Sequence, residues 1–209
     1  MEKQSSDTLK IAGLLTFIGG FLEIYSFLLK GKVFATTITA NIILIMYNIY
    51  SFNFSEIIKY LLPIIFFSFG IVIVELLRKR LKKSSIHWRE YILLLELLLV
   101  VLIYIFKDVR YNMLTISMIS FMSAIQIQTF RKIDNLVYMS TMCTGNTRKI
   151  IESLLKKDMK KAKIFMLIVF SFSLGVIFGA LSIEYIFESA ILLLIIPLIV
   201  IIYLVHYNK

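Results

Sequence analysis

Two short polar motifs interrupt long apolar stretches of this chain, and they carry side chains suited to binding a ligand. Thr39-Ala40-Asn41 recurs as Thr144-Gly145-Asn146. Hydroxyl and amide groups donate and accept hydrogen bonds. Asn and Thr also favour the first residues of a helix, and the positive end of the helix dipole would then point into the membrane interior. The candidate substrate-binding residues are Thr39, Asn41, Thr144, Gly145 and Asn146. The alternative is that these side chains only hydrogen-bond neighbouring helices.

A carboxylate within the first apolar stretch is the leading candidate for a charged group at the same site. Glu23 lies well inside residues 9–29. An ionisable residue inside the hydrocarbon region is costly and usually functional. Its counterpart in the second half of the chain is about Gln126, so the two would line opposite walls of one cavity, with Glu23 available to couple a proton or cation. Alternatively, Glu23 pairs with Lys30 or extends to the outer surface.

Other charged residues near apolar stretches rank lower as candidates. Glu96 lies deeper, in a leucine-rich stretch without an evident partner, and ranks second to Glu23. Glu75 lies one turn before a basic cluster, which favours an ion pair at the interface. Arg148 and Lys149 follow the second motif directly. They would either hold an anionic substrate or anchor the cytoplasmic side, and the positive-inside rule favours anchoring.

The sequence contains no recognisable catalytic or metal-binding pattern. It has one cysteine, Cys143, and two histidines, His87 and His206. These are too few for an internal disulfide or for a cysteine or histidine metal cluster. Neither an HExxH nor a GxSxG pattern is present. We therefore expect no metal and no cofactor, and an enzyme is the least favoured class of function.

The composition of the chain requires a membrane. Of 209 residues, 59% are hydrophobic and 17% are charged, and the mean hydropathy is +0.88. A soluble domain is nearer half apolar and about a quarter charged. The net charge of +10 gathers in short loops between apolar stretches, which is typical of cytoplasmic loops rather than of nucleic-acid binding. The lipid bilayer is the expected partner.

Six stretches are long and apolar enough to span a bilayer as helices, since one span takes about 20 residues. They are residues 9–29, 57–77, 88–106, 111–130, 163–183 and 185–206. Two further segments, 33–50 and 137–155, contain the motifs and are less suited to spanning. The predicted fold is all-α: a polytopic transmembrane helical bundle of six spans plus two short re-entrant or broken helical segments, forming a single domain over 1–209.

The spacing of the motifs indicates an internal duplication. Asn41 and Asn146 are 105 residues apart, and so are Gly70 and Gly175. An offset of half the chain is expected for two copies of one unit. The two repeats would cover about 8–106 and about 110–207.

The charges of the loops relate the two repeats to the membrane. Loops 78–89 and 156–163 are strongly basic and should be cytoplasmic, whereas their counterparts near 183–188 and 51–58 contain no Lys or Arg. Equivalent loops would then lie on opposite sides, so the repeats are inverted. Inverted repeats need an odd number of membrane crossings in each repeat. This condition is met if each motif segment enters and leaves the membrane on the same side. Both termini are then cytoplasmic.

These motifs resemble the signatures of a known family. The run Gly19–Ser26, followed by Val33–Ala35 and the first motif, resembles the first signature of the YoaK family, a group of bacterial membrane proteins also known as DUF1275 or UPF0700. Gln126–Lys132 followed by Thr141–Asn146 resembles the second. The resemblance covers nearly the whole chain. It implies a bacterial plasma-membrane location and six spans, and it implies no activity.

The function hypothesis rests on the repeated polar motifs. We expect a small-solute transporter or channel whose site lies between the two motif segments. The alternative is a non-transport membrane scaffold or regulatory partner subunit, with the basic loops as docking surfaces. Either protein could form a homo-oligomer.

Two residues depart from the family pattern: Glu23 replaces Asp and keeps the carboxylate, and Ala40 replaces Gly, which makes a sharp backbone break in the first motif less favourable.

Overall fold

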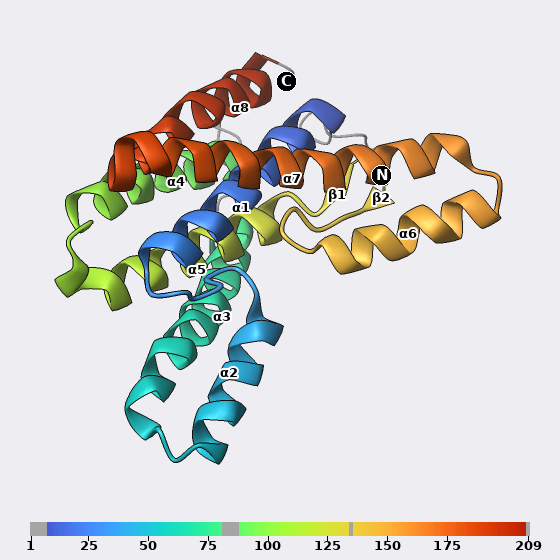
Figure 1. Ribbon diagram of the computed structural model, residues 1–209. Coiled ribbons are helices and arrows are strands. Elements are labelled where there is room, and N and C mark those ends of the chain that lie inside the picture. The colour runs from blue at the N-terminus through green and yellow to red at the C-terminus, as the bar shows by residue number, and fades with distance from the viewer. Residues whose placement is uncertain (1–7, 81–87, 134–135, 208–209) are drawn as a thin grey trace.

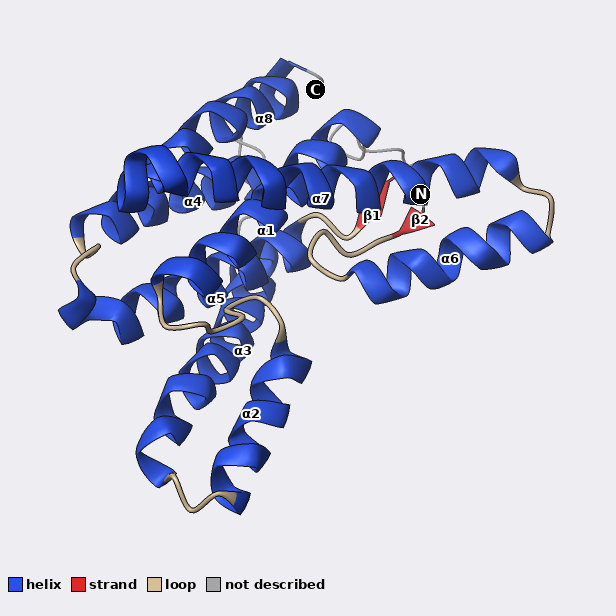
Figure 2. Ribbon diagram, viewed as in Figure 1, coloured by secondary structure: helices blue, strands red, loops and turns tan. Residues whose placement is uncertain are grey.

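The computed structural model describes residues 8–80, 88–133 and 136–207, and these are largely helical (Figure 1, Figure 2). The α-helices are α1 (Leu9–Leu29), α2 (Ile38–Tyr50), α3 (Ile57–Arg80), α4 (Trp88–Ile105), α5 (Asn112–Thr129), α6 (Cys143–Leu155), α7 (Met159–Ile186) and α8 (Ile195–Tyr207). Short 3₁₀ helices are η1 (Phe54–Glu56), η3 (Val109–Tyr111) and η4 (Phe187–Leu194). Strands β1 (Lys132–Ile133) and β2 (Leu136–Val137) pair antiparallel.

Every apolar stretch expected to span a bilayer forms a helix, although the last one begins as the 3₁₀ helix η4. Among the described residues, three helical stretches are long and apolar enough to cross a membrane: Leu9–Leu29, Phe54–Arg80 and Met159–Tyr207. The all-α prediction is confirmed apart from the small β1–β2 pair. The basic segment 81–87, which includes His87, lies outside the described residues, as do the first residues of the N-terminus.

The motif segments fold as continuous helices, which differs from the expected break at the motif. Helices α2 and α6 have 13 residues each and begin one residue before the motif. The residues that precede them, Thr37 and Met142, are not helical and make no side-chain cap hydrogen bond. The chain therefore changes direction before the motif. The motif asparagines then reach back to the preceding loop instead of capping the helix.

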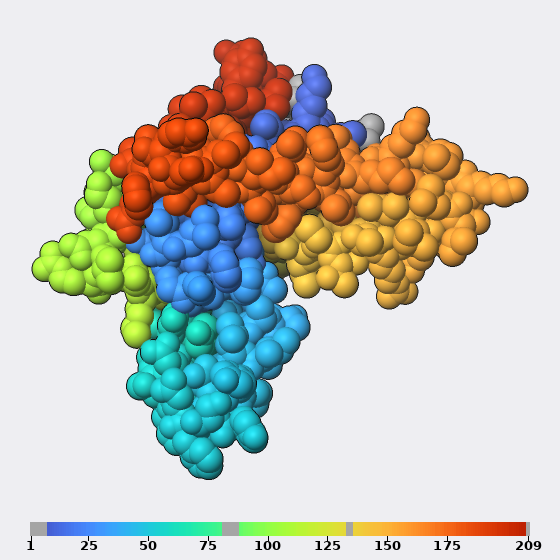
Figure 3. Space-filling view, viewed as in Figure 1, coloured from blue at the N-terminus to red at the C-terminus, as the bar shows by residue number. Residues whose placement is uncertain are grey.

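Two helical hairpins of the same form project from the bundle (Figure 1, Figure 3). We call α2–α3 (38–80) the first hairpin and α6–α7 (143–186) the second hairpin. Each turn contains one residue with left-handed φ, Phe52 (55°) and Lys157 (57°). In both turns the next residue donates its N–H to the carbonyl five residues earlier, at 2.9 Å. Corresponding residues of the turns are 105 apart, as the motif spacing predicts.

Each hairpin packs against the first helix of the other half of the chain: α7 against α1, and α3 against α5. Glycines permit a close approach of the backbones at both crossings. Gly175 and Gly20 meet the backbone carbonyls of Phe17 and Phe172, and an ideal Cβ on Gly70 would lie 3.0 Å from the carbonyl oxygen of residue 121. Gly20 and Gly175 are therefore close-packing positions.

The core of the molecule surrounds α1. In that helix 12 of 21 residues are buried, whereas in α3 only Pro63, Gly70 and Val74 of 24 residues are. The outward faces of the first hairpin are strongly apolar, with Tyr50 at 81% and Phe52 at 82% exposure. Figure 3 shows this hairpin standing clear of the body of the molecule. Apolar surface of this extent requires lipid or another protein to cover it.

Candidate functional site

The carboxylate of Glu23 holds the loop that leads into α2. Glu23 lies in α1 and is only 8% exposed. One carboxylate oxygen, Oε2, accepts hydrogen bonds from the backbone N–H of Thr36 (3.0 Å) and from its hydroxyl (2.7 Å). The other, Oε1, accepts from the hydroxyl of Thr37. Three donors on one buried carboxylate fix its orientation and fasten the start of α2 to α1.

The loop that leads into α6 lies one turn earlier on the same face of α1. An ideal Cβ on Gly19 would lie 2.8 Å from Cγ2 of Thr141 and 3.2 Å from the carbonyl oxygen of Ser140, so glycine makes room for this loop. Gly19 and Glu23 are four residues apart and therefore share a helix face. The thiol of Cys143, the first residue of α6, lies close enough to Glu23 to interact electrostatically with its carboxylate. Helix α1 thus brings the starts of α2 and α6 to neighbouring positions.

The two motif asparagines make the same contact in the two halves of the chain. Nδ2 of Asn41 donates to the carbonyl of Phe34, and Nδ2 of Asn146 donates to the carbonyl of Met139, at 2.9 Å in both cases. Each bond reaches back seven residues and satisfies a loop carbonyl. Both asparagines are buried. Their amide nitrogens are therefore engaged in holding the loops, which leaves the side-chain oxygens for other partners.

Gln126 ties α5 to the loop before α6, much as Glu23 ties α1 to the loop before α2. Its Nε2 donates to the carbonyl of Leu15 (2.9 Å) and to the hydroxyl of Ser140 (3.0 Å). Gly175 meets the carbonyl of Phe17 and Gly70 meets that of Phe121, so residues 17 and 121 correspond at an offset of 104. This offset places Glu23 level with Ile127 rather than Gln126. Gln126 is therefore one residue out of strict register but makes the corresponding contact.

Among the buried polar atoms that have no hydrogen-bond partner in the described residues, three belong to residues at the two junctions: Asn41 Oδ1, Gln126 Oε1 and Thr141 Oγ1. Buried polar atoms are normally paired with protein or with ordered water. Amide and hydroxyl oxygens suit water or a small polar solute. Within the described parts of the chain, no group of three or more His, Cys, Asp or Glu side chains is placed to hold a metal ion.

The remaining predicted site residues lie elsewhere. Thr39 and Thr144 are exposed on the surfaces of α2 and α6. A Cβ added to Gly145 would meet nothing within 4 Å, so neither packing nor its backbone angle requires glycine there. The predicted residues that are buried at the two loop junctions are Glu23, Asn41, Gln126 and Asn146.

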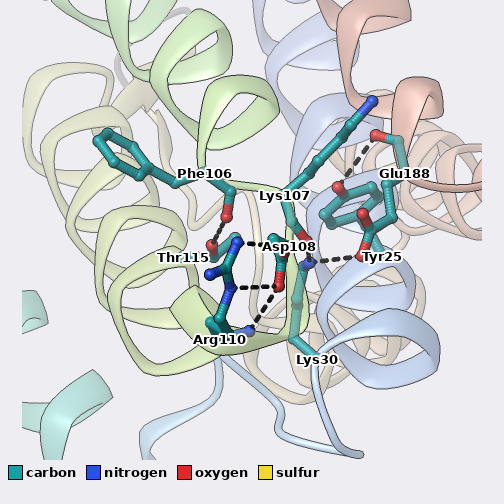
Figure 4. A network of polar contacts seen from close by, with 8 residues as sticks. All are labelled: Tyr25, Lys30, Phe106, Lys107, Asp108, Arg110, Thr115 and Glu188. Atoms are coloured by element: carbon teal, nitrogen blue, oxygen red, sulfur yellow. Dashed lines mark hydrogen bonds and ion pairs between the residues drawn. The ribbon is translucent and has the colours of Figure 1, made fainter.

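Lys30 pairs with Glu188 and not with Glu23 (Figure 4). The Lys30 side chain is fully buried, and its ammonium lies 2.8 Å from Oε1 of Glu188 and 2.6 Å from the carbonyl oxygen of Lys107. The hydroxyl of Tyr25 donates to the backbone carbonyl of Glu188 at 3.1 Å. This network joins the C-terminal ends of α1, α4 and α7, and it leaves the Glu23 carboxylate to the threonines.

Several residues of interest were ranked low or missed in the sequence. Glu96 is completely buried in α4, and neither of its carboxylate oxygens has a partner among the described residues. Thr36 and Thr37, which bind Glu23, were missed as site residues. The repeat was the available signal, because Thr36 and Thr141 are 105 residues apart and both stand in the loops before the motif helices.

The fold and its loop junctions define an all-α protein whose apolar helices are those of a membrane protein. Residues 11–204 match the model of a family described as Protein of unknown function (DUF1275), so the chain belongs to the DUF1275 family. This confirms the resemblance noted in the motifs. No curated protein and no solved structure matches the chain.

Proposed function

We propose that the protein is a six-span transporter or channel of the bacterial plasma membrane, which moves a small polar solute past Glu23. The spans would be α1, α3, α4, α5, α7 and the η4–α8 stretch, with both termini in the cytoplasm. The repeats, about 8–106 and about 110–207, would be inverted. The solute would pass between the loop junctions that precede α2 and α6.

Contacts between helix ends support this topology. It puts the C-terminal ends of α1, α4 and α7 outside, and these ends meet in the Lys30 network. It puts the start of α4 and the end of α8 inside, and Glu90 lies 3.5 Å from His206. It also puts the last turns of α3 and α5 inside, and Gln128 donates to Glu75. Helix ends that the topology assigns to one side therefore contact one another.

The pairing of helices supports an inverted duplication. The pairs α1–α7 and α3–α5 exchange with each other when the two repeats are exchanged, and α4–α8 exchanges with itself. Pairing of this kind is expected when two copies are related by a twofold axis. In transporters built from inverted repeats, the site lies at the interface of the repeats near the midplane.

The observation that carries the proposal is the buried carboxylate of Glu23 beside the starts of both motif helices. A carboxylate inside an apolar bundle is costly to keep and is usually functional. Its donors come from a loop, so they can be exchanged for a ligand without unfolding a helix. The unpartnered oxygens of Asn41 and Thr141 belong to the first turn and loop at the same junctions. A solute or cation bound there would be linked to both hairpins.

Sidedness is the first test. Single cysteines would replace Phe54 and Leu155, which are 62% and 80% exposed near the tips of the two hairpins, in a Cys143→Ser background. A membrane-impermeant thiol reagent added to intact cells is expected to label Phe54→Cys and not Leu155→Cys. Labelling of Leu155→Cys would place the second hairpin outside the cell and would remove the inverted arrangement.

Transport is tested in proteoliposomes. Proton movement is followed with internal pyranine under an imposed potential, and movement of glycerol, urea and small sugars is followed by swelling. We expect a flux that Glu23→Gln lowers about ten-fold or more, since a tenfold change is about 1.4 kcal/mol and one lost charged hydrogen bond is of that size. Glu56→Gln, which alters a partly exposed carboxylate near the first turn, is the control. The absence of any flux, with the expected sidedness, would favour a scaffold or regulatory subunit.

A further inference from the structure

A pocket of about 360 Å³ opens in the second hairpin, between α6, the start of α7 and strand β2. Its lining includes three lysines, Lys149, Lys156 and Lys161, together with the buried ring of Phe165. The ammonium of Lys149 donates to the carbonyl of Val137 and lies 5.1 Å from the centre of the Phe165 ring. The pocket thus combines cationic groups with an apolar side chain.

The acidic residues at this pocket already have basic partners. Asp158 lies 3.0 Å from the ammonium of Lys161 and also accepts its backbone N–H, and these contacts hold the pKa of Asp158 below its usual range. Glu152 pairs with Arg148 at 2.7 Å. Among the described residues, no carboxylate pairs with the other two lysines of the lining. The pocket is therefore left with a positive charge.

The pocket lies where α7 passes from water into apolar surroundings. The first turns of α7 contain Lys160, Lys161 and Lys163, and the sequence is apolar from Ile164 onward. This change marks the level of lipid headgroups at the surface of a bilayer. Helix α6 also suits that level, because it carries both exposed basic residues and exposed Ile151 and Leu155.

The form of the hairpin does not require these lysines. With the 105-residue offset, the positions of Lys149, Lys156 and Lys161 correspond to Leu44, Ser51 and Glu56 in the first hairpin. The first hairpin has the same turn geometry without a single lysine at these places. The form of the hairpin therefore does not explain the three lysines.

We propose that this pocket binds the headgroup of an anionic phospholipid from the adjoining leaflet, with Lys149, Lys156 and Lys161 around its phosphate. Exposed apolar residues continue along α7 directly beyond the pocket: Met166 (41%), Leu167 (40%) and Phe170 (59%). They provide a surface for the acyl chains, which a free phosphate ion would not use. The proposal is independent of solute transport, since neither Glu23 nor the threonines bonded to it line the pocket.

The test compares two triple variants with the same change of charge. One is Lys149→Gln with Lys156→Gln and Lys161→Gln in the pocket. The control is Lys157→Gln with Lys160→Gln and Lys163→Gln, on the same hairpin outside the pocket lining. The purified full-length chain in a neutral detergent is titrated with phosphatidylglycerol, and bound lipid is counted by native mass spectrometry. We expect the Kd to rise about ten-fold or more in the pocket variant and about two-fold in the control, since each tenfold is about 1.4 kcal/mol.

Three outcomes would overturn the proposal. Equal weakening in the two triple variants would mean diffuse attraction between the hairpin and anionic lipid. Displacement of the lipid by inorganic phosphate at equal concentration would mean a site for a soluble anion. Binding of phosphatidylcholine as tight as that of phosphatidylglycerol would remove the charge argument.

A milder variant protects the test against misfolding of the triple variant. Lys156 is exposed, and its single change to Gln should leave the fold intact while raising the Kd of phosphatidylglycerol about three-fold. Glu152→Gln removes a negative charge from the lining and is expected to lower the Kd about two-fold. No change in either direction with both variants folded would also contradict the proposal.

Discussion

The first and second hairpins have the same backbone form, but their motif helices α2 and α6 expose different side chains. Both begin one residue before a motif, both turn through a residue with left-handed φ, and both tie an asparagine to a carbonyl seven residues earlier. Yet α2 is covered with exposed apolar residues such as Ile43 and Tyr47, whereas α6 exposes Arg148 and Glu152. The shared form therefore does not depend on the chemistry of the exposed faces.

The difference shows which contacts determine the fold. The features common to both hairpins are buried or local to the backbone. They are the hydrogen bond from the motif asparagine to the loop carbonyl, the turn with one left-handed residue, and the close approach of two helices at a glycine. The features that differ face outward, where lipid, water and headgroups select the side chains. An inverted duplication would place one hairpin toward each side of the membrane, and their surfaces would then diverge while the internal contacts stayed the same.

The largest effects are expected at the glycine crossings, where the two hairpins differ in tightness. In Gly175→Ala, the new Cβ would collide with the backbone of Phe17, so helix α1 or α7 must move. In Gly70→Ala, the nearest atom is the Cβ of Ala124 at 2.7 Å, with a carbonyl oxygen at 3.0 Å. We expect a loss of about 3 kcal/mol or more at Gly175 and about 1 kcal/mol at Gly70, within the range for overpacked cores.

Thermal unfolding of the purified variants in one detergent measures this difference. Gly145→Ala serves as the control, because a Cβ there meets nothing within 4 Å; it should leave the unfolding midpoint unchanged or slightly raised. If the changes at Gly175 and Gly70 lowered the midpoint equally, the two crossings would be equivalent and the proposed difference in tightness would be wrong.

A smaller and equal effect is expected at the two motif asparagines. Asn41→Ala and Asn146→Ala each leave a loop carbonyl with one hydrogen bond fewer, which should lower the free energy of unfolding by about 1–2 kcal/mol. Thr39→Ala, on an exposed position of α2, should change it by less than about 0.5 kcal/mol. Denaturant or thermal unfolding provides the comparison. A loss confined to one asparagine would show that the two hairpins are held differently.

The helices could be predicted from the sequence because apolar length alone indicates them. The stretch 9–29 matches α1 at both ends, whereas α7 begins at Met159 and not at residue 163, because lysines do not end a helix that extends into water. The partners of Glu23 could not be predicted in the same way. Lys30 and Thr36 follow Glu23 by 7 and 13 residues, and only the path of the loop before α2 decides which of them reaches the carboxylate.

The smallest effect is expected in the turns, and it depends on pH. Asp158 precedes α7 and accepts the backbone N–H of Lys161, which holds its pKa below the usual value; Asn53 stands at the corresponding place in the first hairpin. Because the folded-state pKa is lowered, this contact stabilises the turn above the unfolded pKa of about 3.9, and the stabilisation is lost as the pH falls through the folded pKa. Asn53 has no charge to lose.

Hydrogen exchange of the segment around Lys161, corrected for intrinsic rates, should therefore rise as the pH falls below about 4. The effect should be modest, since the carboxylate of Asp158 is exposed and water competes for it. Asp158→Asn gives the second hairpin the residue of the first, so the pH dependence of this segment should disappear while the turn itself persists. If the variant kept the same pH dependence, another group would control the turn, and the two hairpins would differ in more than their outward chemistry.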